Sequence, residues 1–117
     1  MKLRAIRGAI QVGSNTPEEI ESGVKELLPA ILQANGLNTD EVISVLLTCT
    51  KDLNAAFPAA FAREIGFGAV PLLCAVEMDV PGAMPLVIRV MLHAELPATA
   101  NHVYLRGAAA LRKDLAQ

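Results

Sequence analysis

Aromatic side chains are scarce in this sequence of 117 residues, which has three Phe, one Tyr and no Trp. Ala, Val, Ile and Leu must therefore fill the core. Because small side chains bury less area each, the domain would gain by covering further surface in an oligomer. Hydrophobic residues still make up 53% of the chain and charged residues only 19%, a balance that excludes a disordered chain. We expect one domain with one core over residues 1–117.

Neither an excess of basic charge nor a cysteine framework is present. Ten basic residues stand against twelve acidic ones, so a clustered basic surface for nucleic acid is not expected. Cys49 and Cys74 form no C-x-x-C pair, which is typical of free thiols in a reducing compartment. Charged residues recur every two or three positions in residues 1–7, so the apolar region of a signal peptide cannot form there. No run reaches the roughly 18 apolar residues of a membrane helix. The sequence predicts a cytoplasmic protein that binds neither membrane nor nucleic acid.

The motifs of common cofactor enzymes and hydrolases are also missing. There is no G-x-x-x-x-G-K phosphate loop, no G-x-G-x-x-G motif and no serine in a nucleophile elbow. His93 and His102 are too isolated to suggest a metal site. We therefore expect neither a metal nor a cofactor.

One long amphipathic helix is the clearest element that is present. Thr16 is placed to cap its N-terminus, Pro17 occupies the first helical position, and Glu19 would complete a capping box. Asn35-Gly36 supplies the stop, and Pro29 should bend the axis because proline removes a backbone donor. The apolar stripe that should face the core consists of Ile20, Val24, Leu27, Leu28, Ile31 and Leu32.

The other segments are predicted to form strands, short helices and turns. Residues 2–10 alternate as a strand, with Leu3, Ala5, Arg7 and Ala9 on one face and Ile6 and Ile10 on the other. The segments that follow the long helix are a turn at 39–41, a buried strand at 42–50, a loop at 51–56, a short helix at 58–65, strands at 69–76, 86–94 and 102–105, and an Ala-rich end over about 106–117 with a turn and a mobile tail. Pro71 should lie near the start of its strand or at a sheet edge. This order predicts an α/β (α+β) domain, a mixed sheet packed with one long helix.

Three charged residues occupy positions that are otherwise built for burial. Arg7 shares a strand face with apolar residues, Arg89 lies inside an apolar strand, and Glu77 ends an apolar run. A buried charge without a partner is costly, so each needs a counter-charge or a ligand. In one interpretation Glu77 and Arg89 pair across strands and Arg7 reaches solvent. In the other, guanidinium groups line a concave site for a small carboxylated ligand. The pattern alone favours the first.

Four further side chains have an ordinary interpretation on pattern alone. Tyr104, the only Tyr, would lie at the edge of the core with its hydroxyl in water. Cys74 would be a small buried hydrophobe, Arg63 a solvated surface charge and Phe57 part of the core. None of these indicates a function by itself.

Seven short segments carry a resemblance when they are taken together. They are 4–9 (RAIRGA), 52–59 (DLNAAFPA), 62–64 (ARE), 74–80 (CAVEMDV), 88–91 (IRVM), 102–105 (HVYL) and 111–115 (LRKDL). In this order, over nearly the whole chain, they resemble the small trimeric chorismate mutases of some bacteria.

The resemblance implies a homotrimer whose mixed sheets pack into a barrel-like core with the helices outside. It also implies three active sites, each in a cleft between adjacent subunits. By position, one subunit would supply Arg7, Glu77, Arg89 and Tyr104, its neighbour would supply Phe57, Arg63 and Cys74, and Leu111 and Arg112 would belong to a tail over the cleft mouth.

The implied activity is that of an isomerase, which rearranges chorismate to prephenate in the shikimate pathway to Phe and Tyr. No proton need move in this Claisen-type step, so no catalytic His or metal is expected. Arg89, Glu77 and Arg7 would be the catalytic residues. The substrate-binding residues would be Tyr104, Cys74, Arg63, Phe57, Leu73 and Leu111.

Four positions depart from what this resemblance leads us to expect. Ala60 stands where some relatives have a basic residue, and Leu73 replaces a residue that is often polar. Lys113 replaces a common Pro, and Pro29 is unusual in the long helix.

Two other functions remain open from the residues. One is a trimeric deaminase of enamines or imines, which would also use an Arg for a carboxylate but would not need Glu77 beside a second strand Arg. The other is a trimer that binds a metabolite without converting it, with Arg7, Glu77, Arg89 and Tyr104 serving recognition only.

Overall fold

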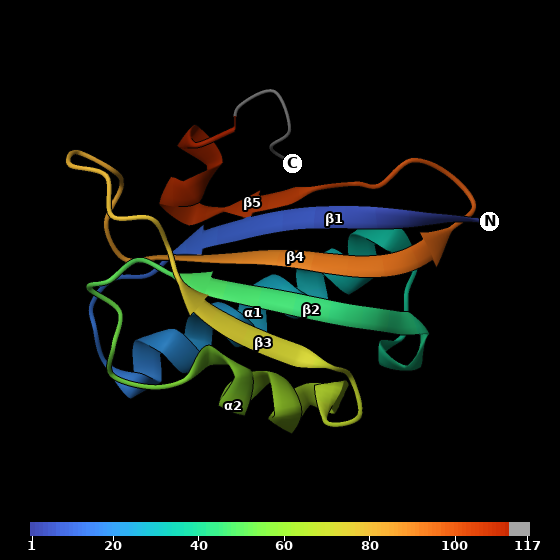
Figure 1. The fold of residues 1–117 in the computed structure, drawn as a ribbon, viewed down its shortest axis with the longest axis horizontal. Helices are drawn as coiled ribbons and strands as arrows, with labels where there is room; N and C mark the ends of the chain where they lie inside the picture. The colour runs from blue at the N-terminus through green and yellow to red at the C-terminus, as the bar shows by residue number, and fades with distance from the viewer. Residues whose placement is uncertain (113–117) are drawn as a thin grey trace.

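Five strands form one sheet in the computed structural model, which describes residues 1–112 (Figure 1). They are β1 (Lys2–Gln11), β2 (Val42–Cys49), β3 (Leu72–Val76), β4 (Val87–Leu96) and β5 (Val103–Leu105), in the spatial order β3-β2-β4-β1-β5. The central strand β4 is antiparallel to β1 and β2, whereas β3 and β5 run parallel to β2 and β1. The predicted mixed sheet is confirmed.

The helical segments leave most of one face of this sheet bare. They are α1 (Pro17–Asn35), α2 (Pro58–Ala62) and the short turns η1 (Thr39–Glu41), η2 (Arg63–Phe67) and η3 (Arg106–Ala110). In Figure 1 α1 crosses behind the sheet, α2 lies beside β3, and the face toward the viewer carries no helix. None of the helices within residues 1–112 combines the length and the apolar character needed to cross a bilayer.

Local chemistry at both ends explains where α1 begins and ends. The Thr16 side chain accepts a hydrogen bond from the Glu19 N–H at 3.1 Å, as predicted. The Glu19 carboxylate, however, accepts from the N–H of Gly13, three residues further back than a capping box requires. Gly36 ends the helix with φ 62°, a conformation that suits glycine. The helix continues through Pro29.

The core lies between α1 and the covered face of the sheet. Its members include Ile6, Ile10, Leu27, Ile31, Leu47 and Leu92, all essentially without solvent exposure. Gly8 allows this close packing, because a Cβ there would lie 2.7 Å from Cδ1 of Ile31 and 2.9 Å from the Val103 carbonyl oxygen. Such contacts are shorter than packed atoms tolerate, so α1 and β5 approach β1 only because residue 8 lacks a side chain.

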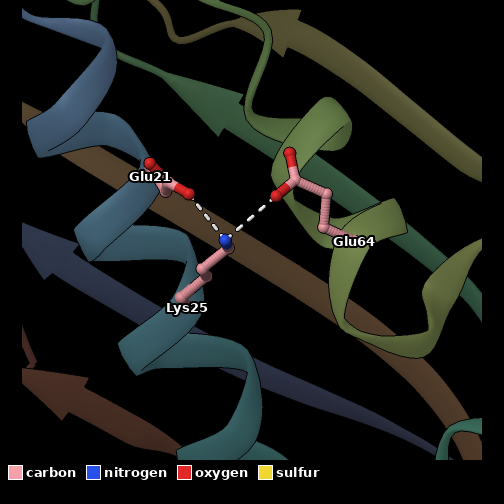
Figure 2. A network of polar contacts seen from close by, with 3 residues as sticks. All are labelled: Glu21, Lys25 and Glu64. Carbon is pink, nitrogen blue, oxygen red and sulfur yellow. Dashed lines mark hydrogen bonds and ion pairs between the residues drawn. The ribbon is translucent and has the colours of Figure 1, made fainter.

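A small polar network connects α1 to the segment after α2 (Figure 2). Nζ of Lys25 lies 2.6 Å from the Glu21 carboxylate and 3.0 Å from that of Glu64. These two hydrogen bonds raise the pKa of the Lys25 ammonium. All three side chains are partly exposed, so the network contributes little energy and mainly orients the two segments.

The uncovered face of the sheet carries exposed leucines, which corrects one prediction. We predicted a buried strand at 42–50, but in β2 only alternate residues are buried. Leu3, Leu46 and Leu73 are 63%, 40% and 62% exposed on strands β1, β2 and β3. Residue Leu46 pairs with Leu73 across the strands, so these side chains form a shared surface.

Most predicted boundaries shift by a few residues, and strand β4 extends to Leu96 rather than to residue 94. Strand β3 begins at Leu72 rather than at residue 69, directly after Pro71, and it is an edge strand as that proline indicated. The turn predicted for the Ala-rich end is confirmed: it spans Arg106–Ala110, and Ala108 is fully buried. Lys113 lies outside the described residues.

Candidate active site

The open face of the sheet carries a hollow of about 240 Å³. Its lining includes Arg7 from β1, Arg89 from β4, Tyr104 from β5 and Glu77, which follows β3 directly. Strand register brings them together: Ala9 lies opposite both Arg89 and Tyr104, and Arg7 is two residues along the same face of β1. Four residues that are widely separated in the sequence therefore meet in one place.

Arg89 and Glu77 pair, and they do so inside this hollow. Nε of Arg89 lies 3.7 Å from Oε2 of Glu77, and the Thr48 hydroxyl donates to the same carboxylate oxygen. The separation exceeds a hydrogen bond, and within residues 1–112 this buried Nε has no hydrogen-bond partner. Glu77 is thus close enough to attract the guanidinium without accepting a hydrogen bond from its Nε. The two interpretations of these charges are compatible.

Arg7 and Tyr104 are less exposed than the ordinary interpretation predicted. Arg7 lies in the middle of β1 and is half-buried, so it does not reach solvent from a strand end. Tyr104 is only 4% exposed and packs with Ala9, Val87 and Ala108, and Leu111 packs against this cluster. The turn η3 therefore covers one wall of the hollow, and Leu111 lies near Tyr104.

A second hollow, of about 430 Å³, lies at the β3 edge of the molecule. It is lined by residues 53–58, which lead into α2, and by 74–76 of β3, so it contains both Phe57 and Cys74. Phe57 is 75% exposed, which contradicts the interpretation of it as core. This hollow opens beside α2, whereas the Arg89 hollow opens on the bare face of the sheet.

Two predicted site residues and one position that departs from the family resemblance lie outside both hollows. Arg63 is exposed where α2 passes into η2, and it lines neither hollow. Leu73 is exposed on the bare face beside Leu46 and is not part of either lining. Ala60, one of the departures, is half-buried in α2.

Comparison with known proteins places this geometry in one family. A model of the family "Chorismate mutase type I" matches residues 3–115. The chain belongs to the chorismate mutase type I family. A chorismate mutase AroH from Thermus thermophilus is 49% identical over 117 residues, covering 97% of this chain and 96% of the relative. One from Bacillus subtilis is 41% identical over 119 residues, covering 98% and 94%.

A solved structure agrees with the fold. A chorismate mutase from Clostridium thermocellum superposes with a TM-score of 0.88 at 45% identity, covering 91% of this chain and 97% of that one. The comparisons confirm the predicted family, the α+β fold and the enzyme class, an isomerase of the chorismate mutase type.

Sequence reasoning missed several residues of the Arg89 hollow. Thr48 is the most informative, because its hydroxyl binds the Glu77 carboxylate. Leu46 and Met91 also line the hollow. A signal for Thr48 was present: it is a polar residue in an apolar strand, directly opposite Arg89 in the antiparallel register. Pairing of β2 with β4 had to be known before that signal could be used.

The two thiols differ in their surroundings. Burial raises the pKa of the Cys49 thiol to about 12, and the nearby Cys74, Asp52 and Glu77 add to the effect. Cys49 is therefore an inert core residue. Cys74 is half-buried at the second hollow. In the part of the chain that the structure describes, no three His, Cys, Asp or Glu side chains cluster as metal ligands would.

Proposed function

We propose that this protein rearranges chorismate to prephenate in a cleft formed between two copies of the chain in a homotrimer. One observation carries the proposal: the Arg89 hollow and the Phe57 hollow open on different sides of β3. One protomer cannot bring the two linings around a single small molecule. A neighbouring copy that presents its Phe57 hollow to the bare sheet face of the first would complete the site.

The apolar surface of the bare face supports the trimer. Leu3, Leu46 and Leu73 would remain in water in a lone protomer, and a cluster of this kind is typical of an interface. Burial of this surface among three copies would add the apolar area that a core poor in aromatic residues lacks.

Arg89 would be the main catalytic group. In a Claisen-type rearrangement one carbon–oxygen bond breaks and one carbon–carbon bond forms within one molecule, and the ether oxygen gains negative charge as its bond stretches. A guanidinium that donates to this oxygen binds the transition state more strongly than the substrate. The Arg89 side chain lines the hollow and is 40% exposed there, which suits this role.

Glu77 would accept a hydrogen bond from the ring hydroxyl and hold Arg89 in place. Its carboxylate is itself positioned by Thr48. Arg7 and Tyr104 would bind a substrate carboxylate, so that the enolpyruvyl arm is held over the ring in a reactive conformation. Each of these residues lines the hollow that contains Arg89.

The neighbouring copy would supply the remaining contacts. Phe57 would form an apolar wall, Cys74 a weak polar contact near the ring hydroxyl, and Arg63 positive potential at the mouth. Leu73 would lie at the junction of the two copies. Leu111, which packs against the Tyr104 cluster, would help to cover the bound substrate.

We also propose that the reaction serves aromatic amino acid biosynthesis in the cytoplasm. Both cysteines are free thiols, which agrees with a reducing compartment.

The decisive experiment incubates the purified protein with chorismate and follows the loss of the diene absorbance. The wild type should consume chorismate and release prephenate. Arg89→Ala should lose about a hundredfold in turnover, since removing one transition-state donor costs about 3 kcal/mol. A wild type that leaves chorismate untouched, or binds prephenate without forming it, would contradict the proposal and favour a binding protein.

A further inference from the structure

The chain enters β4 through a residue in an unusual backbone conformation. Leu86 has φ 58°, which is disfavoured for any residue with a β-carbon. Such a conformation persists only where the surrounding structure holds it. Leu86 immediately precedes β4, and Arg89 lies three positions further on.

Asp52 and Thr50 hold this entry point from the opposite loop. One carboxylate oxygen of Asp52 accepts from the Leu86 N–H at 2.9 Å, and the other accepts from the Thr50 hydroxyl. The Thr50 oxygen in turn accepts from the Val87 N–H at 3.1 Å, and the Thr50 N–H donates to the Val87 carbonyl oxygen at 3.0 Å. Two successive amides before Arg89 are thus bound by one linked pair of side chains.

The same corner also reaches the segment that carries Glu77. The Glu77 N–H donates to the carbonyl oxygen of Cys49, the residue just before Thr50, at 2.8 Å. The loop that holds the start of β4 therefore continues the strand that holds Glu77. A displacement of this corner would change the separation of Arg89 from Glu77, which is already too long for a hydrogen bond.

We propose that Asp52 is a positioning residue for Arg89, which acts by fixing Leu86 in its left-handed conformation. The inference rests on the proposed function. Asp52 does not line the Arg89 hollow, so it acts through the backbone of β4 and not by contact with the substrate. Small displacements of a group that must meet a developing charge have large effects on rate.

The first test compares Asp52→Asn and Asp52→Ala with the wild type. The Asn amide retains only one acceptor oxygen, and Ala retains none, so the hold on Leu86 weakens in that order. Turnover should fall by about tenfold for Asn and about a hundredfold for Ala, with KM for chorismate nearly unchanged, because Arg89 acts mainly in the transition state. The control is Asp79→Ala, which removes an exposed carboxylate that pairs with Lys51 at 3.0 Å. It should keep wild-type turnover.

The second test asks whether the backbone conformation carries the effect. Glycine adopts positive φ without strain, so Leu86→Gly in the Asp52→Asn background should restore most of the lost turnover. Leu86→Gly alone should stay close to the wild type. An Asp52 that acted through its charge would show no such rescue.

Stability is measured on every variant by thermal unfolding. If Asp52→Ala does not fold, Thr50→Val takes its place, since it removes the hydroxyl that binds both Asp52 and Val87. The inference is overturned if Asp52→Asn keeps wild-type turnover, or if Leu86→Gly fails to rescue it. Wild type and Arg89→Ala are assayed beside these variants. If Arg89→Ala loses activity while the Asp52 variants do not, the proposed function stands and only this inference fails.

Discussion

The two faces of the single sheet differ in composition and in burial. The face under α1 is packed by aliphatic side chains, and among the described residues no polar or charged side chain is fully buried. The bare face combines exposed leucines with two guanidinium groups and a carboxylate. The covered face is fully buried within one chain. The bare face, in contrast, has half-buried charges and exposed apolar area that a ligand or a second copy would have to cover.

The contrast separates stability from catalysis. Charges are tolerated on the bare face because they are only half-buried and partly paired, and they would be far more costly under α1. Substitutions on the covered face should therefore change folding, and substitutions on the bare face should change assembly or turnover.

The largest effect is expected when the two hollows are disabled in different chains. Arg89→Ala and Phe57→Asp should each be nearly inactive, the first by about a hundredfold. Because the proposed site takes Arg89 from one copy and Phe57 from another, mixed trimers of the two variants contain some sites with both halves intact. Chorismate turnover should then reappear when the two proteins are unfolded and refolded together.

The matched control mixes Arg89→Ala with Arg7→Ala. Both residues line the same hollow, so every copy in a mixed trimer lacks either Arg7 or Arg89 and no site has both. Activity that also returns in this control, or that fails to return in the first mixture, would contradict a site shared between copies. Arg89→Lys should be almost as slow as Arg89→Ala, since one ammonium cannot reproduce the planar fork of donors.

A large change in stability is expected from Leu27→Ala on the covered face. Leu27 is fully buried, so the free energy of unfolding should fall by about 3 kcal/mol through lost burial and a new cavity. Leu73→Ala, on the bare face, removes the same atoms from a largely exposed position. Urea unfolding at several protein concentrations separates them. The Leu27 deficit should persist throughout, whereas the Leu73 deficit should be small at low concentration and grow as rising concentration favours assembly, which buries Leu73.

A smaller effect is expected from Thr48→Val on the bare face. Valine keeps the shape and the preference for strands but removes the hydroxyl that positions Glu77. Turnover should fall about fivefold, the equivalent of one hydrogen bond of about 1 kcal/mol, with the unfolding midpoint almost unchanged. An equal loss of stability and no loss of turnover would show that Thr48 serves the fold instead.

Elements specified by local chemistry were the ones that sequence could predict. The bounds of α1 follow from Thr16, Pro17 and Gly36, which act within a few residues of themselves. The donor to the Glu19 carboxylate was predicted wrongly, because the turn before the helix brings the Gly13 N–H within its reach, a feature of tertiary geometry.

The candidate site could be predicted only in part. Arg7, Glu77 and Arg89 stand out because charge is unexpected among apolar residues, and the family resemblance adds Tyr104, Phe57 and Cys74. Thr48 is a polar residue in an apolar strand, a signal that can be used only once the pairing of β2 with β4 is known. The hydrogen bond of Asp52 to the Leu86 N–H depends on a backbone turn that no pattern in the chain reveals. Arg63 and Leu73 line neither hollow of one protomer, as expected if their partners belong to another copy.

The smallest effect is expected at His102, where the backbone of a site residue meets a titratable ring. Nδ1 of His102 accepts from the Arg7 N–H at 2.9 Å, which requires that nitrogen to be unprotonated. Burial lowers the pKa of His102 below its ordinary value of 6.5, and the charges of Arg7 and Arg112 lower it further. The unfolded chain therefore takes up a proton at a higher pH than the folded one. The stability from this group is complete above pH 6.5 and declines as the pH falls toward the lowered pKa.

Urea unfolding from about pH 7.5 to about pH 5 should show this decline in the wild type and less of it in His102→Asn, whose amide oxygen can accept the same hydrogen bond without titrating. Identical pH profiles would mean that the Arg7 backbone is held in place without help from the imidazole, and that strand pairing alone positions that edge of the site.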